Sequence, residues 1–451
     1  MNRELPTENS NYQGSYPLSS NVLAASDRRH LWHPFTQQQE WCSTDPLIIV
    51  SGQGVMLRDN HGCDYIDGNS SIWTNIHGHS HPDIVKAIAH QAATLDHTSF
   101  LGTTHPMAIK LAERLVDLLP GSPLPRVFFS DNGSTAIEAA LKMTLQYWQL
   151  VGQPERCQFA AFANGYHGDT AGAASLGGIG LFADRFAKMH FSTQHLTSID
   201  DLESLPHPEK LAAVVIEPCI QGAAGMRLWP EGMLKKLRSF CDRTGTLLIL
   251  DEVMTGFGRT GAMFACQREG ITPDFLAVAK GITGGSLPLA ATMVTEKIYS
   301  AFLGTYEEQK TFYYGHSYTA NPIAAAAALA SLEIFEQESV LEKLQKKIAH
   351  FTTCLHQLTS LPHVAEIRQC GFIAGIEVML DPTKRIPFPW QEQTGAKICF
   401  TARKYGLLTR PVRDTLVLMP PLCISEEQIS QAVEALGKAI LTSKIVTKRL
   451  S

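Results

Sequence analysis

Apolar runs alternate with amphipathic segments through the middle of the chain. Short apolar runs, typical of buried strands, occupy residues 126–130, 158–162, 212–218, 246–252, 274–280 and 289–294. Helical periodicity lies between several of them, at 134–150 and 231–244. Near-continuous apolar strands joined by helices predict a mostly parallel sheet that helices cover on both faces.

The flanking regions follow other patterns. Short strands are expected at 47–50 and within 55–68, and helices at 82–97 and 106–119. After a long helix that begins near residue 322, helices and strands alternate to the end, which predicts a smaller α+β domain. We therefore predict an α/β protein with a loose N-terminal arm (1–28), an N-terminal segment of the small domain (29–80), a large α/β domain (81–335) and a C-terminal small α+β domain (336–451).

Composition narrows the class of protein. The 451 residues are 44% hydrophobic and 18% charged, with a net charge of −5, which fits a globular protein with a large core. Lys and Arg are scattered, so we expect no nucleic-acid partner. The apolar runs are too short to span a bilayer and residues 1–28 lack a secretory pattern, so we expect no membrane partner. The 10 cysteines form no CxxC pair, which indicates free thiols and a cytoplasmic location.

An acid and a base follow two of the apolar strands. "LLILD" ends in Asp251, and "DFLAVAK" ends in Lys280 before a Gly-rich turn. In open α/β sheets ligands bind beyond the carboxyl ends of strands, where both side chains should lie. Burial would make the Lys280 amine a nucleophile, and Asp251 could keep a pyridine nitrogen protonated, as pyridoxal phosphate (PLP) chemistry requires. For this pair alone, the alternative is a buried ion pair that only stabilises the sheet.

Two loops complete the predicted site. In "SDNGSTAIEAA", Gly133 and Ser134 follow a strand and begin a helix, whose free amides would bind a phosphate. The alternative is an ordinary N-cap. "NGYHGDT" places Tyr166 in a loop, where its ring could stack on a cofactor or simply pack beside His167.

Two further motifs suggest other ligands. "GFGRTG" (256–261) has the G-x-G-x-x-G spacing of a dinucleotide site, but the two acids that precede it would repel a pyrophosphate. "HGHSHP" (77–82) alternates histidines as a metal site can, but without cysteine or carboxylate, so we expect loop hydrogen bonds and no metal.

Taken together, "LDEVMTGFGRTG" and "PDFLAVAKGITGG" resemble the signature around the cofactor lysine of the class III aminotransferases. The similarity extends from about residue 30 to 440. It implies a fold-type I transferase with PLP as cofactor, small-molecule substrates, and a homodimer whose subunits share each active site. The resemblance implies that Lys280 holds the cofactor as a Schiff base and moves the proton, Asp251 pairs with the ring nitrogen, Gly133 and Ser134 hold the phosphate, and Tyr166 flanks the ring.

Other roles implied by the resemblance lie outside these motifs. Gly315, His316 and Ser317 would come from the partner subunit, with Ser317 reaching the phosphate. Arg410 would bind a substrate carboxylate, for which its planar fork of donors is suited.

"LWHPFTQ", "DGNSSIWTNIHGH" and "FYYGHSYTANP" are similar to a biotin-pathway branch that converts 8-amino-7-oxononanoate into 7,8-diaminononanoate. Phe35, Ile72 and Trp73 are substrate contacts in members whose amino donor is S-adenosylmethionine, where tyrosine and tryptophan usually replace Phe35 and Ile72. His316-Ser317 likewise stands where Pro-Thr is usual. A wall of Phe35, Ile72 and Trp73 would suit the stem of L-lysine, the donor of a smaller branch, so both donors stay open and the sequence favours lysine.

Two alternative functions remain. One is another ω-aminotransferase, acting on ornithine, 4-aminobutyrate or β-alanine. The other is a catalytically silent protein of the same fold that serves as a binding or regulatory subunit.

Overall fold

The computed structural model describes residues 20–443. The chain divides into two compact units: unit 1 is Met1–Gly52 with Leu57–Asp64, and unit 2 is Gln53–Met56 with Tyr65–Ser451. Unit 2 contains both the predicted large domain and the predicted C-terminal domain. The subdivision at residues 80 and 335 stays a prediction.

The described part of unit 1 includes helices α1 (Ser20–His30) and α2 (Gln38–Ser43). Trp41 Nε1 donates to Asp27 at 2.7 Å, and Arg28 donates to the Thr44 carbonyl at 2.6 Å. Residues 20–28 of the predicted loose arm are thus helical and contact residues further along the chain, and the arm as a separate segment stays a prediction. Residues 1–19 lie outside the described residues.

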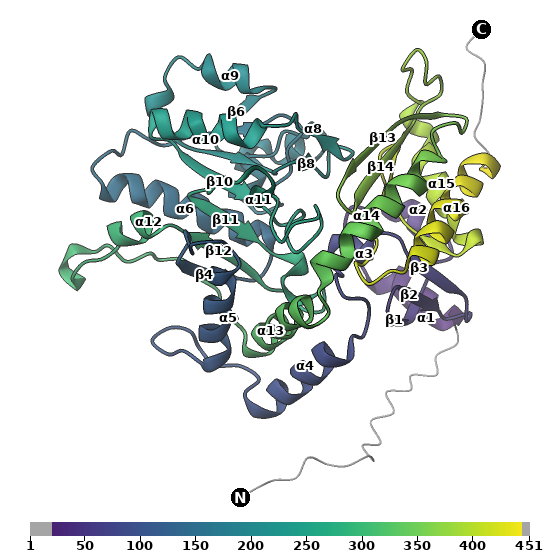
Figure 1. Ribbon diagram of the computed structural model, residues 1–451, viewed down its shortest axis with the longest axis horizontal. Helices are drawn as coiled ribbons and strands as arrows, with labels where there is room; N and C mark the ends of the chain where they lie inside the picture. The colour runs from purple at the N-terminus through teal and green to yellow at the C-terminus, as the bar shows by residue number, and fades with distance from the viewer. Residues whose placement is uncertain (1–19, 444–451) are drawn as a thin grey trace, which may run out of the picture. The chain divides into compact units, whose positions relative to one another are not determined.

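Unit 2 is built on a seven-stranded sheet with strand order β4-β12-β11-β10-β7-β5-β6. Only β12 runs antiparallel to its neighbours, and the other pairs are parallel. The mostly parallel sheet and the α/β class are thus confirmed (Figure 1). The strands are β4 (Arg126–Ser130), β5 (Gln158–Phe162), β6 (Thr193–Leu196), β7 (Leu211–Ile216), β10 (Leu247–Asp251), β11 (Phe275–Val278) and β12 (Ala290–Val294).

Successive strand residues point to opposite faces of this sheet, and the apolar side chains on each face are buried against helices. Val215 packs in a core with α6 (Gly133–Leu150), while Val214 belongs to the core that includes α5 (Pro106–Asp117) and α10 (Met233–Thr244). The helices α4 (Pro82–Thr94) and α13 (Pro322–Gln337) contact each other in a further core cluster.

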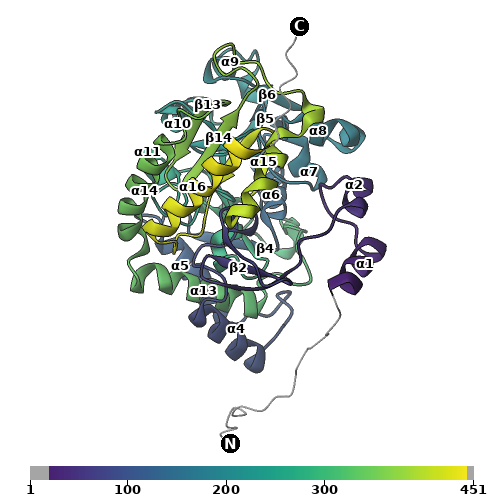
Figure 2. The same cartoon turned by 90° about the vertical axis from the view of Figure 1, so that its right-hand side faces the viewer.

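A second, antiparallel sheet follows in the C-terminal part of unit 2. Its order is β13-β14-β17-β16, with bounds Val364–Cys370, Ile373–Val378, Thr415–Leu418 and Pro411–Val412. Helix α16 (Glu426–Thr442) lies beside α14 (Val340–His356) and α15 (Thr394–Ala402), as Figure 2 shows. This arrangement of strands and helices is the predicted α+β pattern.

The other elements are short: β1 (Ile49–Gln53), β2 (Met56–Asp59), β3 (Asp64–Asp67), α3 (Ser70–Trp73), α7 (Ala171–Ser175), α8 (Gly180–Ala183), η1 (Asp184–Met189), α9 (Ile199–Glu203), η2 (Pro208–Lys210), β8 (Ile220–Gln221), β9 (Arg227–Leu228), α11 (Cys266–Glu269), η3 (Lys280–Thr283), α12 (Glu296–Ala301), η4 (Tyr306–Glu308), η5 (Trp390–Glu392), η6 (Arg403–Tyr405) and β15 (Leu407–Leu408). Between residues 20 and 443, no helix has both the length and the apolar character that crossing a membrane requires.

Candidate active site

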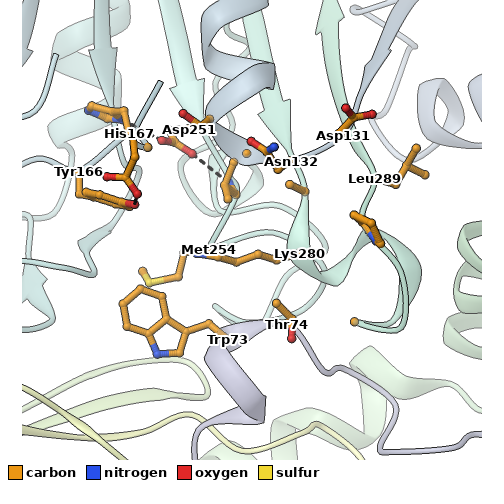
Figure 3. A pocket seen from close by; sticks show the side chains of 18 of the residues that line it. Trp73, Thr74, Asp131, Asn132, Tyr166, His167, Asp251, Met254, Lys280 and Leu289 are labelled. Carbon is orange, nitrogen blue, oxygen red and sulfur yellow. Dashed lines mark hydrogen bonds and ion pairs between the residues drawn. The ribbon is translucent and has the colours of Figure 1, made fainter. Parts of the chain in front are cut away.

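A pocket of about 780 Å³ opens at the carboxyl ends of β7, β10 and β11, beside the start of α6 (Figure 3). Its lining includes Lys280, Asp251, Tyr166 and Trp73, four of the residues predicted from the sequence. All of its lining residues belong to unit 2. The neighbouring parallel strands β10 and β11 therefore bring the predicted acid and base into one cavity, as the strand-end rule requires.

Lys280 follows β11 and begins η3 with a left-handed backbone, φ 47°. Burial lowers the pKa of its amine to about 8, although the negative charges of Asp251 and Glu217 oppose this. The Lys280 Nζ atom lies 4.8 Å from the centroid of the Trp73 ring. The lysine can therefore act as a neutral amine near physiological pH.

Asp251 ends β10 and is held by two donors. His167 Nδ1 lies 2.8 Å from Oδ2, and the Val253 amide donates to Oδ1 at 3.1 Å. The His167 side chain is 1% exposed. Burial alone would lower the pKa of His167, but its hydrogen bond and the charges of Asp251 and Glu217 together raise it. The sequence motif "NGYHGDT" gives no indication of this pairing between His167 and Asp251.

Glu217 is a further acidic side chain of the pocket, which the sequence motifs did not indicate. It follows β7, lines the pocket, and accepts hydrogen bonds from the Tyr166 amide at 3.0 Å and the Gly222 amide at 2.9 Å. Burial raises its pKa to about 7. The signal was present in "AAVVIEP", where an acid follows an apolar strand as Asp251 does.

The predicted phosphate turn is the N-terminus of α6. Asn132 caps this helix by accepting from the Thr135 amide at 3.1 Å, and Gly133 and Ser134 line the pocket. A Cβ on Gly133 would lie 2.5 Å from a methyl group of Val253, so only glycine fits there. Free amides at the start of an 18-residue helix can bind an anion.

Tyr166 lines the pocket as predicted, but its hydroxyl is engaged elsewhere. It donates to Asp169 at 2.8 Å, and burial raises its pKa. Its ring stands edge-on to Phe182 at 5.9 Å. Stacking of Tyr166 on a cofactor ring stays a prediction.

Trp73 lines the pocket from a turn with an unusual backbone. Ser70, Ser71 and Trp73 have φ values of 48°, 61° and 65°, a region that costs non-glycine residues on the order of 1–3 kcal/mol each. Ile72 is 44% exposed and is not among the residues that line the pocket. A substrate contact by Ile72 stays a prediction.

The remaining predicted residues do not line this pocket. Arg410 is exposed. Within the same chain, Nδ1 of His316 lies 3.7 Å from the Asp131 carboxylate, and neither Gly315 nor Ser317 borders the cavity. Phe35 is 65% exposed and belongs to unit 1. The roles predicted for these residues remain predictions.

The two motifs that suggested other ligands have structural roles. Arg259 of "GFGRTG" is buried and donates to the carbonyls of Asn75 and Pro420. In "HGHSHP", His77 pairs with Ser331 at 3.0 Å and His79 with Asp67 at 2.8 Å. Among residues 20–443, no group of three or more His, Cys, Asp or Glu side chains is arranged to hold a metal.

Comparison with known proteins gives one consistent family. The protein-family model described as "Aminotransferase class-III" matches residues 38–440 of this chain. The chain is 46% identical to the adenosylmethionine-8-amino-7-oxononanoate aminotransferase of Geobacter sulfurreducens, over 92% of this chain and 96% of that protein. It is 43% identical to the protein of the same name from Aquifex aeolicus, over 94% and 98% of the two chains.

Solved structures agree with these matches. The enzyme of that name from Methanocaldococcus jannaschii superposes with a TM-score of 0.93 at 40% identity, covering 94% of this chain and 100% of that one. An amine transaminase from an uncultivated Pseudomonas species, solved in its PLP-bound internal aldimine form, gives a TM-score of 0.87 at 32% identity, covering 91% and 98%. The fold-type I architecture predicted from the sequence is confirmed.

Proposed function

Because the chain belongs to the class-III aminotransferase family, we propose that it transfers an amino group to the ketone of 8-amino-7-oxononanoate, forming 7,8-diaminononanoate in biotin biosynthesis. The names of relatives from several organisms support this acceptor. The observation that carries the proposal is a single pocket in which Lys280, Asp251 and the start of α6 meet.

PLP fits this pocket through its functional groups. The lowered pKa of Lys280 favours covalent attachment of the cofactor aldehyde to its amine. Asp251 can pair with the pyridine nitrogen, and the amides at Gly133 and Ser134 can bind the phosphate. When bound, the cofactor supplies a cationic ring that delocalises the electron pair released at the substrate carbon.

Lys280 performs the proton transfer. With a pKa of about 8, a useful fraction of its amine is neutral near pH 7.5, a representative cellular pH. Nζ can then take the proton from the amine-bearing carbon of the donor and deliver one to carbon 7 of the acceptor. The Trp73 ring beside Nζ covers one side of the amine and limits its access to water.

Asp251 supplies the negative charge that faces the ring nitrogen. His167, donating from Nδ1, fixes the direction of this carboxylate in a buried setting. Because its pKa is raised to about 7, Glu217 carries only part of a negative charge near neutral pH, which limits the negative charge that surrounds Asp251.

For the amino donor, S-adenosylmethionine and L-lysine are each favoured by an observation. The printed names of the relatives and the aromatic face of Trp73 in the pocket favour S-adenosylmethionine, whose sulfonium and adenine suit such a face. Phe35 and Ile72 at positions usually held by tyrosine and tryptophan favour lysine. We propose S-adenosylmethionine first, and lysine remains the second candidate.

The functional unit is proposed to be a homodimer in which Gly315, His316 and Ser317 complete the partner's site. Tyr313 and Tyr318, which flank this segment, are 82% and 64% exposed, as expected of an apolar surface that a second copy covers. We also propose that Arg410 binds the acceptor carboxylate. The 10 free cysteines support a cytoplasmic location.

The test is product formation by the purified holoenzyme. With 8-amino-7-oxononanoate and either donor, mass spectrometry should detect 7,8-diaminononanoate, and Lys280→Ala should yield none. Absence of this product from the parent enzyme, together with turnover of ornithine, 4-aminobutyrate or β-alanine, would replace the proposal with another ω-aminotransferase.

A further inference from the structure

The turn that carries Trp73 into the pocket adopts its conformation without glycine. Residues 69–74 read Asn-Ser-Ser-Ile-Trp-Thr, yet Ser70, Ser71 and Trp73 all have left-handed φ values. Non-glycine residues keep such a backbone only where surrounding groups hold it, and such sites cluster near ligands.

A buried carboxylate bonds this turn at two points, and the Ser70 hydroxyl donates to the Met419 carbonyl at 2.7 Å. Asp67 has a side chain 2% exposed; its Oδ1 accepts from the Asn69 amide at 3.1 Å and its Oδ2 from the Ser71 amide at 2.7 Å. A third donor, His79 Nε2, lies 2.8 Å from the same Oδ2. Asp67 therefore bonds the backbone on both sides of Ser70.

The tautomer of His79 follows from its second contact. The amide nitrogen of Asn75 lies 3.2 Å from Nδ1 and can only donate, while the Asn75 oxygen accepts from the Gly78 amide at 2.7 Å. Nδ1 is thus the acceptor, and Nε2 carries the proton that it donates to Asp67. The histidine run "HGHSHP" thereby gains a role that the proposed reaction does not use.

The same turn ends on the pocket wall. Trp73 Nε1 donates to the Asn69 side chain at 3.0 Å, which links the indole to the segment that Asp67 holds. In Figure 3 the indole lies on one side of Lys280 and Asp251 on the other. A shift of the turn would move the Trp73 ring relative to Lys280.

We propose that Asp67, oriented by His79, is a positioning residue that sets the place of the Trp73 ring and thereby the affinity of the pocket for its amine substrates. Asp67 itself does not line the pocket. This inference rests on the proposed function only for the identity of the substrates.

Asp67→Asn tests it directly. The variant keeps the size of the side chain but replaces one acceptor oxygen with a donor, so at least one of the contacts to Asn69 and Ser71 is lost. The holoenzyme should show KM values raised roughly 10-fold or more for both substrates, as small misplacements near a reacting centre cause. The cofactor dissociation constant should stay within about twofold of the parent value. His77→Gln is the matched control, because His77 is buried in the same run but bonds Ser331, and its KM values should not change.

A double-mutant cycle separates positioning from general damage. If Asp67 acts through Trp73, Asp67→Asn should raise KM far less in a Trp73→Phe background than in the parent. Additive effects, or a variant that loses cofactor while KM stays constant, would overturn the proposal. Should Asp67→Asn fail to fold, His79→Leu should raise KM in the same way. His79→Gln, which keeps a donor, should raise KM less than His79→Leu does.

A substrate-free readout keeps the proposal independent of the reaction. Energy transfer from Trp73 to the bound cofactor is measured as the part of the cofactor's tryptophan-excited emission that is lost in Trp73→Phe. This part should be smaller in Asp67→Asn. If the parent enzyme does not use 8-amino-7-oxononanoate, the proposed function fails while this measurement still decides the role of Asp67. Unchanged energy transfer would contradict that role.

Discussion

Replacing His167 by leucine should weaken cofactor binding more than it weakens the fold. The substitution removes the donor that lies 2.8 Å from Asp251 Oδ2 and leaves the Val253 amide as the remaining donor to Asp251 within the described residues. A hydrogen bond to a charged group contributes about 1.5–3 kcal/mol. At 1.4 kcal/mol per tenfold, the dissociation constant of PLP should rise about 10- to 100-fold.

The assay is a titration of the apoenzyme with PLP, followed by quenching of tryptophan fluorescence. His167→Gln, which can still donate, should recover part of the affinity. The control is His105→Leu, because His105 is equally buried but bonds the Ala320 carbonyl away from the pocket. A change below twofold in His167→Leu, or an equal rise in His105→Leu, would refute the reasoning.

Other residues give predictions of different kinds. Glu217 has a pKa raised to about 7, so the unfolded chain loses this proton near pH 4.5 while the folded protein keeps it until about 7. The free energy of unfolding should therefore fall by up to about 3 kcal/mol as the pH rises through that window. Chemical denaturation should show no such fall for Glu217→Gln, and the same pH dependence in both proteins would disprove the assignment. Arg410→Ala should cost about 2–3 kcal/mol in the acceptor half-reaction and leave cofactor binding unchanged; an unaltered acceptor KM and rate would remove its role. In single turnovers, S-adenosylmethionine should change the cofactor absorbance faster than L-lysine, and the reverse order would identify lysine as the donor.

The central sheet and the two principal site residues could be predicted from the sequence. The runs at 126–130 and 158–162 coincide with β4 and β5, because buried strands must be continuously apolar. Strand β6 escaped the prediction, since "TQHL" is largely polar and pairs only with β5 at the edge. Lys280 and Asp251 were found because the carboxyl ends of parallel strands meet at one edge.

The rest of the site depends on contacts between distant segments. Nothing in "NGYHGDT" indicates that His167 meets Asp251, 84 residues later. The left-handed turn at Ser70–Trp73 has no glycine to announce it, because it is held by Asp67 and His79 rather than by local preference. Arg410 and residues 315–317 were assigned through the resemblance alone, and their places outside this chain's pocket leave those roles to be tested.

The most direct test of the central claim is where the cofactor attaches. The purified protein, reduced with borohydride and digested, should carry the pyridoxyl group on the peptide that contains Lys280, whose amine lies in the pocket with a pKa near 8. Peptide mapping by mass spectrometry should locate it there at close to one group per chain. A pyridoxyl group on Lys297 or Lys310, or its absence from a protein that still transaminates, would contradict the account.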